Sequence, residues 1–379
     1  MSQIAPPDDV DLIQLLTPTG QRVDRPDYSP QIAHLDAAAL RGMYRDMLLT
    51  RRFDTEATAL QRQGELGLWA QSLGQEAAQV GSGRAAAPQD MIFPAYREHG
   101  VAFVRGLELT KILRQFRGID HGGWDPKDHN FHLYTLVIGS HTLHATGYAM
   151  GMQRDGVVGT GDPQRDAATM VYFGDGATSQ GDTNEALVFA AVNNAPVVFF
   201  CQNNQWAISE PTSRQSRVPL YHRGQGFGIP SLRVDGNDVL ACYAVTSEAL
   251  ERARSGGGPT FIEAFTYRMG AHTTSDDPTR YRSAAEEQYW RDRDPIDRLL
   301  ALMKAEDAVD DAWLAELDAE ATAFGEHIRT TVRSFERPSS DFMFRNVYAG
   351  PHAIVDDERA WFEAYQRTFA DAPATEGGH

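Results

Sequence analysis

Short apolar runs alternate with helix-forming segments of about a dozen residues in the middle of the chain. Each run ends abruptly at glycine or polar residues, as buried strands do. Strands that are apolar throughout are typical of a parallel sheet, because crossover helices cover both of its faces. We therefore predict an α/β fold with a mostly parallel sheet and helices on both faces. The expected strands are 168–173, 196–201, a run opening at 232–234, and 260–266.

The patterns on either side of this region divide the chain into three expected parts. Residues 1–35 hold five prolines and no sustained periodicity, so we expect an N-terminal arm. A helical apolar stripe begins at Asp36, a candidate N-cap, and opens an α/β domain expected to span 36–330. Residues 331–379 are aromatic-rich and contain proline, and we expect them to form a helical and irregular C-terminal tail that serves as an interface segment.

Charge and cysteine content narrow the classes of function. The 379 residues include 35 basic and 52 acidic side chains, a net charge of −17, which disfavours binding to nucleic-acid phosphates. A phosphorylated ligand would therefore need local donors or a metal. The two cysteines, Cys201 and Cys242, cannot form a disulfide framework, and no apolar stretch reaches about eighteen residues. With no signal peptide evident, we expect a cytoplasmic protein that does not span a membrane.

Two polar turns directly follow two of the predicted strands. Gly174-Asp175-Gly176 ends the first strand, and Asn203-Asn204 ends the next. Either turn alone is common, but parallel strands bring their carboxyl ends to one edge of a sheet, where such folds bind ligands. The glycines let the backbone approach a ligand, and Asp175 and Asn204 offer the hard oxygen atoms that Mg²⁺ prefers. The sequence therefore predicts a site for Mg²⁺ and a diphosphate.

The sequence around these turns resembles a known family. A GDG turn followed by NN is similar to the thiamine-diphosphate signature. The segments GDGATSQGDTNEAL, FFCQNNQWAIS and YRMGAHTTSDDPTRYR resemble the alpha subunit of the first component of 2-oxo acid dehydrogenase complexes. The resemblance extends from about Tyr44 to about Tyr348 and includes GQEA at 74–77 and AYREHG at 95–100. It implies a thiamine-diphosphate-binding fold.

The resemblance also implies roles for individual residues. Asp175, the side chain of Asn204 and the main-chain carbonyl of Trp206 would hold Mg²⁺. Arg97 would bind the diphosphate, which a guanidinium fork suits, and Ile138 would hold the cofactor in its bent form. The implied cofactor contacts are Tyr96, Arg97, Ile138, Gly174, Asp175, Gly176, Ala177, Asn204, Trp206 and His272.

His272 is the predicted catalytic histidine, with Tyr96 as a second catalytic candidate. The resemblance implies that His272 contacts the cofactor phosphate and assists acyl transfer to a lipoyl group. Because histidine titrates near neutrality, we expect it to donate a proton to a lipoyl sulfur; a solvated loop histidine is the alternative. The implied hydrogen-bonding network of its loop consists of Arg268, Asp276, Tyr281 and Arg282.

The resemblance implies oxidative decarboxylation of a 2-oxo acid and reductive acylation of a lipoyl group. In this family a glutamate of a separate beta subunit activates the cofactor, so we expect an α₂β₂ heterotetramer that docks on a lipoyl acyltransferase core. SDDPTRYRS and YWRDRDPI favour a branched-chain substrate, whereas Gln202, where branched-chain members usually have arginine, and LVIGSHTLHATG favour pyruvate. An acetoin dehydrogenase subunit and a non-catalytic assembly module are further alternatives.

Other features have ordinary interpretations. His121, His129 and His132 match no structural zinc spacing, and we expect solvated loop residues there. Glu76, in GQEA, lies near the predicted site, where packing or an ion pair would explain it as well as catalysis. Thr273 follows His272 where animal members carry a regulatory serine, so the sequence does not predict kinase control at this position.

Overall fold

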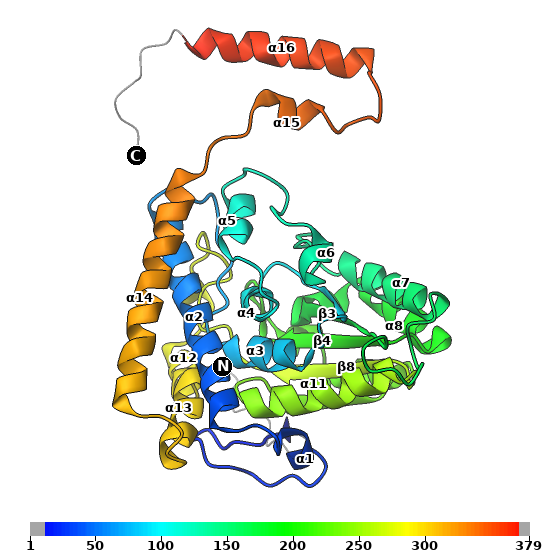
Figure 1. Cartoon of the computed structure of the whole chain (residues 1–379), viewed down its shortest axis with the longest axis vertical. Coiled ribbons are helices and arrows are strands. Elements are labelled where there is room, and N and C mark those ends of the chain that lie inside the picture. Colours follow the sequence, from blue (N-terminus) through cyan, green and yellow to red (C-terminus); the bar gives the residue numbers. More distant parts are fainter. Residues whose placement is uncertain (1–11, 371–379) are drawn as a thin grey trace. The chain divides into compact units, whose positions relative to one another are not determined.

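The computed structural model describes residues 12–370, which form two compact units (Figure 1). The first unit extends to Arg333 and the second begins at Ser334. Residues 1–11 of the expected N-terminal arm lie outside the described residues. The rest of that segment contributes a strand, β1 (Leu12–Ile13), to the sheet of the first unit.

A six-stranded, entirely parallel sheet lies at the centre of the first unit, which confirms the predicted α/β fold. The strand order is β1-β7-β8-β4-β3-β2. A separate antiparallel hairpin pairs β5 with β6. The bounds are β2 Met91–Phe93, β3 Thr169–Gly174, β4 Val197–Asn203, β5 Trp206–Ala207, β6 Glu210–Pro211, β7 Ser231–Asp235 and β8 Thr260–Phe265.

Helices cover both faces of the sheet (Figure 1). Successive residues of β3 point to opposite faces, as the period of a strand requires. Val171 and Phe173 pack in one apolar core with α7 (Ser140–Arg154) and α8 (Gly181–Asn193). Tyr172 points to the other face, where its hydroxyl lies 2.8 Å from the hydroxyl of Ser82 in α3. That face is covered by α3 (Glu76–Ala85) and α11 (Val239–Arg254).

The remaining helices of the first unit surround these layers. The side chain of Asp36 accepts a hydrogen bond of 2.9 Å from the amide of Ala39, which confirms the predicted N-cap. The bounds are α1 Ser29–Ile32, α2 Ala37–Arg62, α4 His99–Val104, α5 Thr110–Phe116, α6 Pro126–His129, α9 Thr212–Gln215, α10 Tyr221–Gly226, α12 Ala284–Arg291, α13 Pro295–Ala305, α14 Asp311–Ser334, and the 3₁₀ helices η1 Asp175–Ser179 and η2 Pro278–Arg280.

The second unit consists mainly of α15 (Ser340–Phe344) and α16 (Ala353–Ala370), which pack against each other. Phe344 and Phe362 form the ring contact between them, with centroids 6.0 Å apart. Much of the apolar surface of α16 is nevertheless uncovered within the described chain, since Trp361 is 68% exposed.

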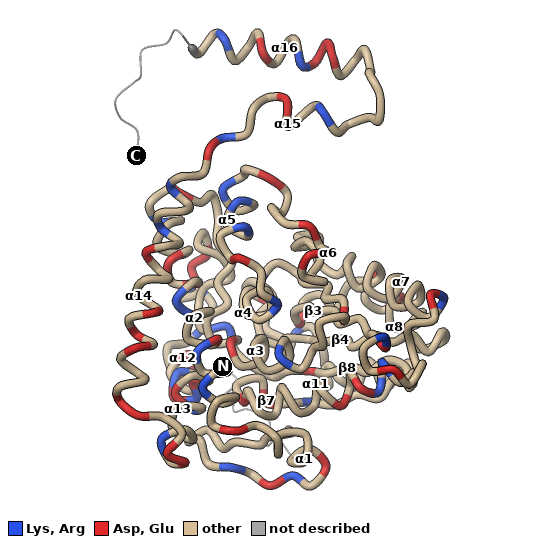
Figure 2. The backbone as a smooth tube through the Cα atoms, in the orientation of Figure 1, with Lys and Arg blue, Asp and Glu red and all other residues tan. Residues whose placement is uncertain are grey.

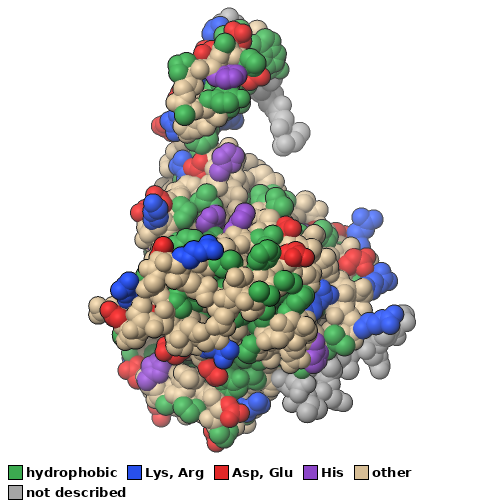
Figure 3. Space-filling model, turned by 90° about the vertical axis from the view of Figure 1, so that its right-hand side faces the viewer, with side chains coloured by type: hydrophobic (Ala, Val, Ile, Leu, Met, Phe, Trp, Pro, Cys, Tyr) green, Lys and Arg blue, Asp and Glu red, His purple; other side chains and the backbone are tan. Residues whose placement is uncertain are grey.

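Two neighbouring strands of the sheet are free of charged residues. Figure 2 shows charges concentrated on helices and loops, and β3 and β4 carry none. The end of the first unit that carries α7 and α8 faces the viewer in Figure 3, where hydrophobic side chains reach the surface. Tyr148 of α7 and Phe189 and Val192 of α8 are exposed. No helix in the described part of the chain combines the length and apolar character needed to cross a membrane.

Candidate active site

The carboxyl ends of β3 and β4 open onto a cavity of about 360 Å³. Gly174 and Gln202 are register partners in these neighbouring strands, so the two polar turns lie side by side, as predicted. The β5–β6 hairpin and the segments around residues 96 and 272 complete the wall. The predicted cofactor contacts all line this cavity: Tyr96, Arg97, Ile138, Gly174, Asp175, Gly176, Ala177, Asn204, Trp206 and His272.

Asp175 is a buried carboxylate held in place by neutral donors. It is 1% exposed, and its Oδ2 accepts hydrogen bonds from Gln215 Nε2 at 2.9 Å and from Thr212 Oγ1 at 3.3 Å. Burial raises the pKa of this carboxyl, which means that its charge is costly in the ligand-free chain. A cation beside Asp175 would offset that cost, so this side chain fits a metal ligand.

The other two predicted metal ligands belong to a tight turn and hairpin. Asn204 Oδ1 accepts only a long hydrogen bond, 3.3 Å, from the amide of Trp206. The carbonyl of Trp206 accepts a hydrogen bond of 2.6 Å from Arg268 Nη1, and its second lone pair can still bind a metal. Oxygen atoms of a carboxylate, an amide and a main-chain carbonyl are the donor set that Mg²⁺ takes.

Arg268 also supports a strained backbone at the cavity wall. Ile208 has a φ of 56°, a left-handed conformation that is rare for a β-branched residue. Arg268 Nη2 donates to the Ile208 carbonyl at 3.0 Å, and this bond helps to hold the hairpin. Burial, and then the charge of Arg97, lower the pKa of Arg268 to about 10, so it remains a cation at neutral pH.

His272 lies against Arg97. Arg97 Nη2 donates to the main-chain carbonyl of His272 at 2.8 Å and lies 3.3 Å from its Nδ1. Burial, with the charges of Arg97 and Arg268, lowers the pKa of His272 to about 3. The expected titration near neutrality therefore does not hold for the ligand-free chain, where the imidazole is neutral. An anion bound beside these guanidinium groups would raise that pKa.

The remaining predicted loop residues surround His272 without lining the cavity. Asp276 Oδ2 accepts a hydrogen bond of 2.9 Å from the amide of His272 and another from the Tyr281 hydroxyl. Arg282 donates to the carbonyls of Arg268 and, at 2.9 Å, of Gly270. These bonds fix the loop on which His272 lies.

Several cavity residues were not singled out by sequence reasoning. Gln215 binds Asp175, and Gln75 Oε1 accepts a hydrogen bond of 3.2 Å from Asn204 Nδ2. Glu98 is buried next to Arg97, and its Oε1 accepts a hydrogen bond from the side-chain amide of Gln202. Gln75 lies in the GQEA segment and Glu98 in the AYREHG segment. Both segments belong to the family resemblance, so this signal could have pointed to the two residues.

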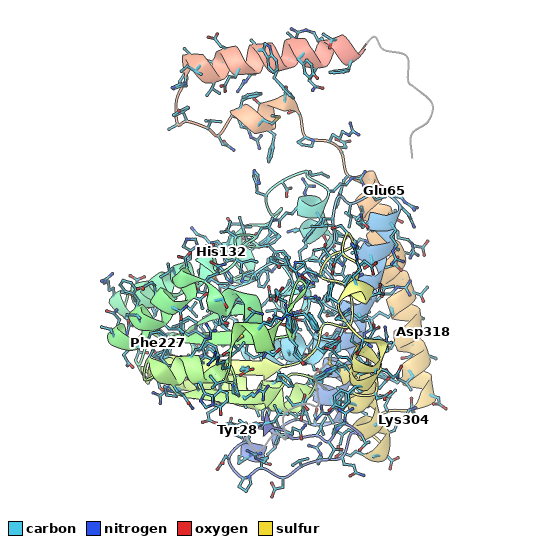
Figure 4. The ribbon with its side chains drawn as sticks, turned by 180° about the vertical axis from the view of Figure 1, so that it is seen from behind. Tyr28, Glu65, His132, Phe227, Lys304 and Asp318 are labelled. Carbon is cyan, nitrogen blue, oxygen red and sulfur yellow. The ribbon has the colours of Figure 1, made fainter. Side chains whose placement is uncertain are left out.

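Glu76 and His132 have structural contacts. Glu76 Oε1 accepts a hydrogen bond of 2.9 Å from Arg51 Nε, and its Oε2 accepts one of 2.9 Å from the amide of Gly74. This ion pair explains its burial. His132, labelled in Figure 4, stacks on Phe93 with ring centroids 4.8 Å apart. Neither side chain lines the cavity.

The environment of His272 predicts how it titrates. In the ligand-free chain its ring should stay neutral between about pH 5 and pH 8, because protonation would place a third cation beside Arg97 and Arg268. Nuclear magnetic resonance of the ring protons, assigned with a His272→Gln variant, should show no titration step in this window. Replacing Arg97 with glutamine should move the pKa upward. In denaturant the same signal should titrate near 6.5, and a native step there would contradict the assignment.

Comparison with known proteins identifies the family. Residues 44–335 match the model of the dehydrogenase E1 component family. The chain is 45% identical over 346 residues to the 3-methyl-2-oxobutanoate dehydrogenase subunit alpha of Mycobacterium tuberculosis, covering 90% of each chain. It is 38% identical over 327 residues to the mitochondrial 2-oxoisovalerate dehydrogenase subunit alpha 2 of Arabidopsis thaliana, covering 83% of this chain and 68% of that one. Over 266 residues it is 42% identical to the pyruvate dehydrogenase E1 component subunit alpha of Acholeplasma laidlawii, covering 70% and 75%. The chain therefore belongs to the dehydrogenase E1 component family, as an alpha subunit of the 2-oxo acid dehydrogenases.

Proposed function

We propose that this chain is the alpha subunit of a branched-chain 2-oxo acid dehydrogenase that uses thiamine diphosphate and Mg²⁺. The observation that carries the proposal is the cavity at the ends of β3 and β4, where the predicted cofactor contacts come together. The relatives support the substrate class, since the Mycobacterium tuberculosis subunit named for 3-methyl-2-oxobutanoate matches over 90% of this chain. We also propose a cytoplasmic location, from the sequence alone.

Different residues of the cavity would bind the metal ion, the phosphate groups and the rest of the cofactor. Bound thiamine diphosphate supplies a nucleophilic carbon and an electron sink for decarboxylation. Asp175, Asn204 and the carbonyl of Trp206 would hold Mg²⁺, which neutralises phosphate charge. Arg97 would bind phosphate oxygens with the guanidinium group that now meets main-chain carbonyls. Ile138, 43% exposed, would pack against the cofactor.

Tyr96 and His272 are the proposed catalytic side chains. Their rings lie 6.4 Å apart at nearly right angles, on the same wall of the cavity. His272 is neutral without ligand, so it would accept a proton when phosphate charge offsets Arg97, and would then hold that proton for a lipoyl sulfur. The hydrogen bond from its amide to Asp276 keeps the loop in position.

The proposal includes a beta subunit that completes the site, as the family implies, in an α₂β₂ heterotetramer docked on a lipoyl acyltransferase core. Apolar side chains beside the cavity support an interface there. Leu136 and Val137 are 58% and 70% exposed in the loop that leads to Ile138. The exposed aromatic residues of α16 form a second candidate surface, consistent with the interface role expected for the tail.

Pyruvate is the second candidate substrate. Gln202 stands where branched-chain members of the family usually have arginine, and the Acholeplasma laidlawii relative is named for pyruvate. The choice between these acids depends on a few side-chain contacts, because one methylene in an apolar pocket changes specificity by about 10- to 200-fold.

A reconstituted enzyme tests the proposal. We expect the chain, co-expressed with its beta subunit, to oxidise 3-methyl-2-oxobutanoate in the presence of thiamine diphosphate, Mg²⁺ and an artificial electron acceptor. The value of kcat/KM for this acid should exceed that for pyruvate by at least about 10-fold. The reverse preference would reassign the substrate and retain the cofactor chemistry. Absence of turnover on both acids, with no cofactor bound, would contradict the proposed function.

A further inference from the structure

A buried glutamate and a buried glutamine form a polar pair in the cavity wall. Glu98 and Gln202 both line the cavity, and each is 2% exposed. Gln202 Nε2 donates to Glu98 Oε1 at 2.7 Å, and Glu98 Oε2 accepts a hydrogen bond of 3.2 Å from the amide of Arg97. Gln202 is the register partner of Gly174, so the pair lies beside the turn that presents Asp175.

This pair leaves one hydrogen-bonding group unmatched. Gln202 Oε1 is buried and finds no hydrogen-bond partner among the described residues. A buried acceptor without a donor destabilises the arrangement that contains it. The mismatch follows from the charge of Glu98, because an ionised carboxylate only accepts and the amide must turn its NH₂ group toward it. A protonated Glu98 would instead donate to Oε1, and the NH₂ group would turn away.

The groups around Glu98 leave its charge poorly compensated. Arg97 is the cation next to it, but both Nη atoms of Arg97 donate to main-chain carbonyls elsewhere. Tyr134 and Tyr172 are buried, and burial together with the charge of Glu98 raises the pKa of each hydroxyl, so both stay neutral. Burial raises the pKa of Glu98 itself to about 7, although the amide and the charge of Arg97 oppose the shift.

The cavity holds further charges that an anionic ligand would meet. The ionisable groups among its lining residues, besides Glu98, are Tyr96, Arg97, His141, Asp175, Glu210, Arg268 and His272. The two arginines attract an anion, whereas Asp175, Glu98 and Glu210 repel it. Asp175 can be matched by a metal ion, but Glu98 has only the Gln202 amide and main-chain amides as donors, which leaves a proton as the simplest means of removing its charge.

We propose that Glu98 takes up one proton from solvent when the diphosphate of the cofactor enters the cavity, and that the Gln202 amide turns over with it. The inference rests on the proposed function, because it takes thiamine diphosphate as the ligand. The carboxylate becomes a carboxylic acid that donates to Gln202 Oε1, so the unmatched acceptor gains its partner. The NH₂ group of Gln202 gives up its present hydrogen bond to Glu98 Oε1. Cofactor binding is therefore linked to pH through a residue that is not itself a metal ligand.

The sign of the linkage follows from these states. Below about pH 6, Glu98 already carries the proton, so binding adds none at this residue. Above about pH 7, binding must draw a proton from solvent, so affinity falls as pH rises, by up to about 10-fold per pH unit. An arginine at position 202 would pair with Glu98 and keep it ionised in both states, so the linkage is specific to glutamine at this position.

Calorimetry on the full chain co-expressed with its beta subunit tests the inference. Thiamine diphosphate is titrated with saturating Mg²⁺ near pH 8, in two buffers of different ionisation enthalpy, to give the protons taken up per site. The wild type should take up close to one proton more than Glu98→Gln, and the proton changes of the cofactor itself cancel in this difference. Asp54→Asn is the matched control, because Asp54 is a buried carboxyl whose pKa burial also raises to about 7 but which does not line the cavity. It should retain the uptake of the wild type.

The outcomes separate this inference from the proposed function. Equal proton uptake by wild type and Glu98→Gln would overturn the inference, while the proposed function would stand. If wild type binds no thiamine diphosphate, the proposed function itself fails. Gln202→Arg provides an independent variant should Glu98→Gln not fold. It should lose the additional proton uptake and the steep loss of affinity above about pH 7, and unchanged uptake in Gln202→Arg would overturn the inference.

Discussion

Asp175→Asn is expected to abolish 2-oxo acid turnover without destabilising the ligand-free chain. Asparagine keeps the shape of the side chain and an oxygen for Gln215, but it removes the one negatively charged ligand of the proposed Mg²⁺ set. We expect Mg²⁺-dependent binding of thiamine diphosphate to weaken by at least about 100-fold, since changes in outer contacts of metal sites alone cost about 10- to 100-fold. Calorimetric titration of cofactor into the reconstituted enzyme measures this loss.

The thermal stability of ligand-free Asp175→Asn should not fall, in contrast to its activity. Burial raises the pKa of Asp175 above its value in the unfolded chain, so the ionised carboxylate is a net cost to the fold at neutral pH. A neutral amide removes that cost, and the Tm of the ligand-free variant should equal or exceed that of the wild type. Sites that bind charged ligands commonly show this opposition between function and stability.

Asp90→Asn is the matched control. Asp90 is also fully buried, but it forms an ion pair with Arg254 and accepts a hydrogen bond of 2.9 Å from the amide of Ala168, away from the cavity. Its replacement should lower Tm and leave cofactor binding unchanged. If Asp175→Asn bound thiamine diphosphate as tightly as the wild type, Asp175 would not be a metal ligand.

The fold was predictable where the signal was local and long enough. β3, β4 and β8 have six or seven mostly apolar residues, and sequence patterns find such strands readily. β1 and β2 have two and three residues, too few to show any periodicity. They belong to the sheet because their backbones pair with β7 and β3, respectively. The expectation that residues 1–35 form an arm therefore could not include a strand at the edge of the sheet.

The site residues also divide into those with a local sequence signal and those that depend on contacts between distant residues. Asp175 and Asn204 were predictable because each follows its strand directly, and parallel strands bring such turns together. Gln215 and Glu98 depend on contacts with residues 40 and 104 positions away, which no local pattern reports. The low pKa of His272 depends on Arg97, 175 positions earlier, so the sequence could suggest a histidine at the site but not its charge.

Asp238→Ala is expected to cause the largest loss of stability, about 3–5 kcal/mol. Its Oδ1 caps α11 by accepting hydrogen bonds from two amides of the first turn, and its Oδ2 accepts bonds of 2.7 and 2.6 Å from the amides of Leu15 and Leu16. Arg298, 2% exposed, lies 3.5 Å from the same carboxylate. The alanine variant therefore loses a cap, leaves two buried amides without acceptors and removes one of the anions around a buried guanidinium. Urea unfolding measures the total.

Asp36→Ala separates the cap from the other contacts. Asp36 caps α2 through one hydrogen bond of 2.9 Å and is exposed, so its loss should cost only about 1 kcal/mol. The difference between the two losses in unfolding free energy would measure how firmly the segment after residue 11 is anchored to the sheet. Amide hydrogen exchange at Leu15 and Leu16 should become faster only in Asp238→Ala. Equal losses in the two variants would mean that this segment contributes little to the fold. A larger loss at Asp238 would mean that part of a segment with no sequence periodicity is integral to the α/β unit, held there by one buried carboxylate rather than by apolar packing alone.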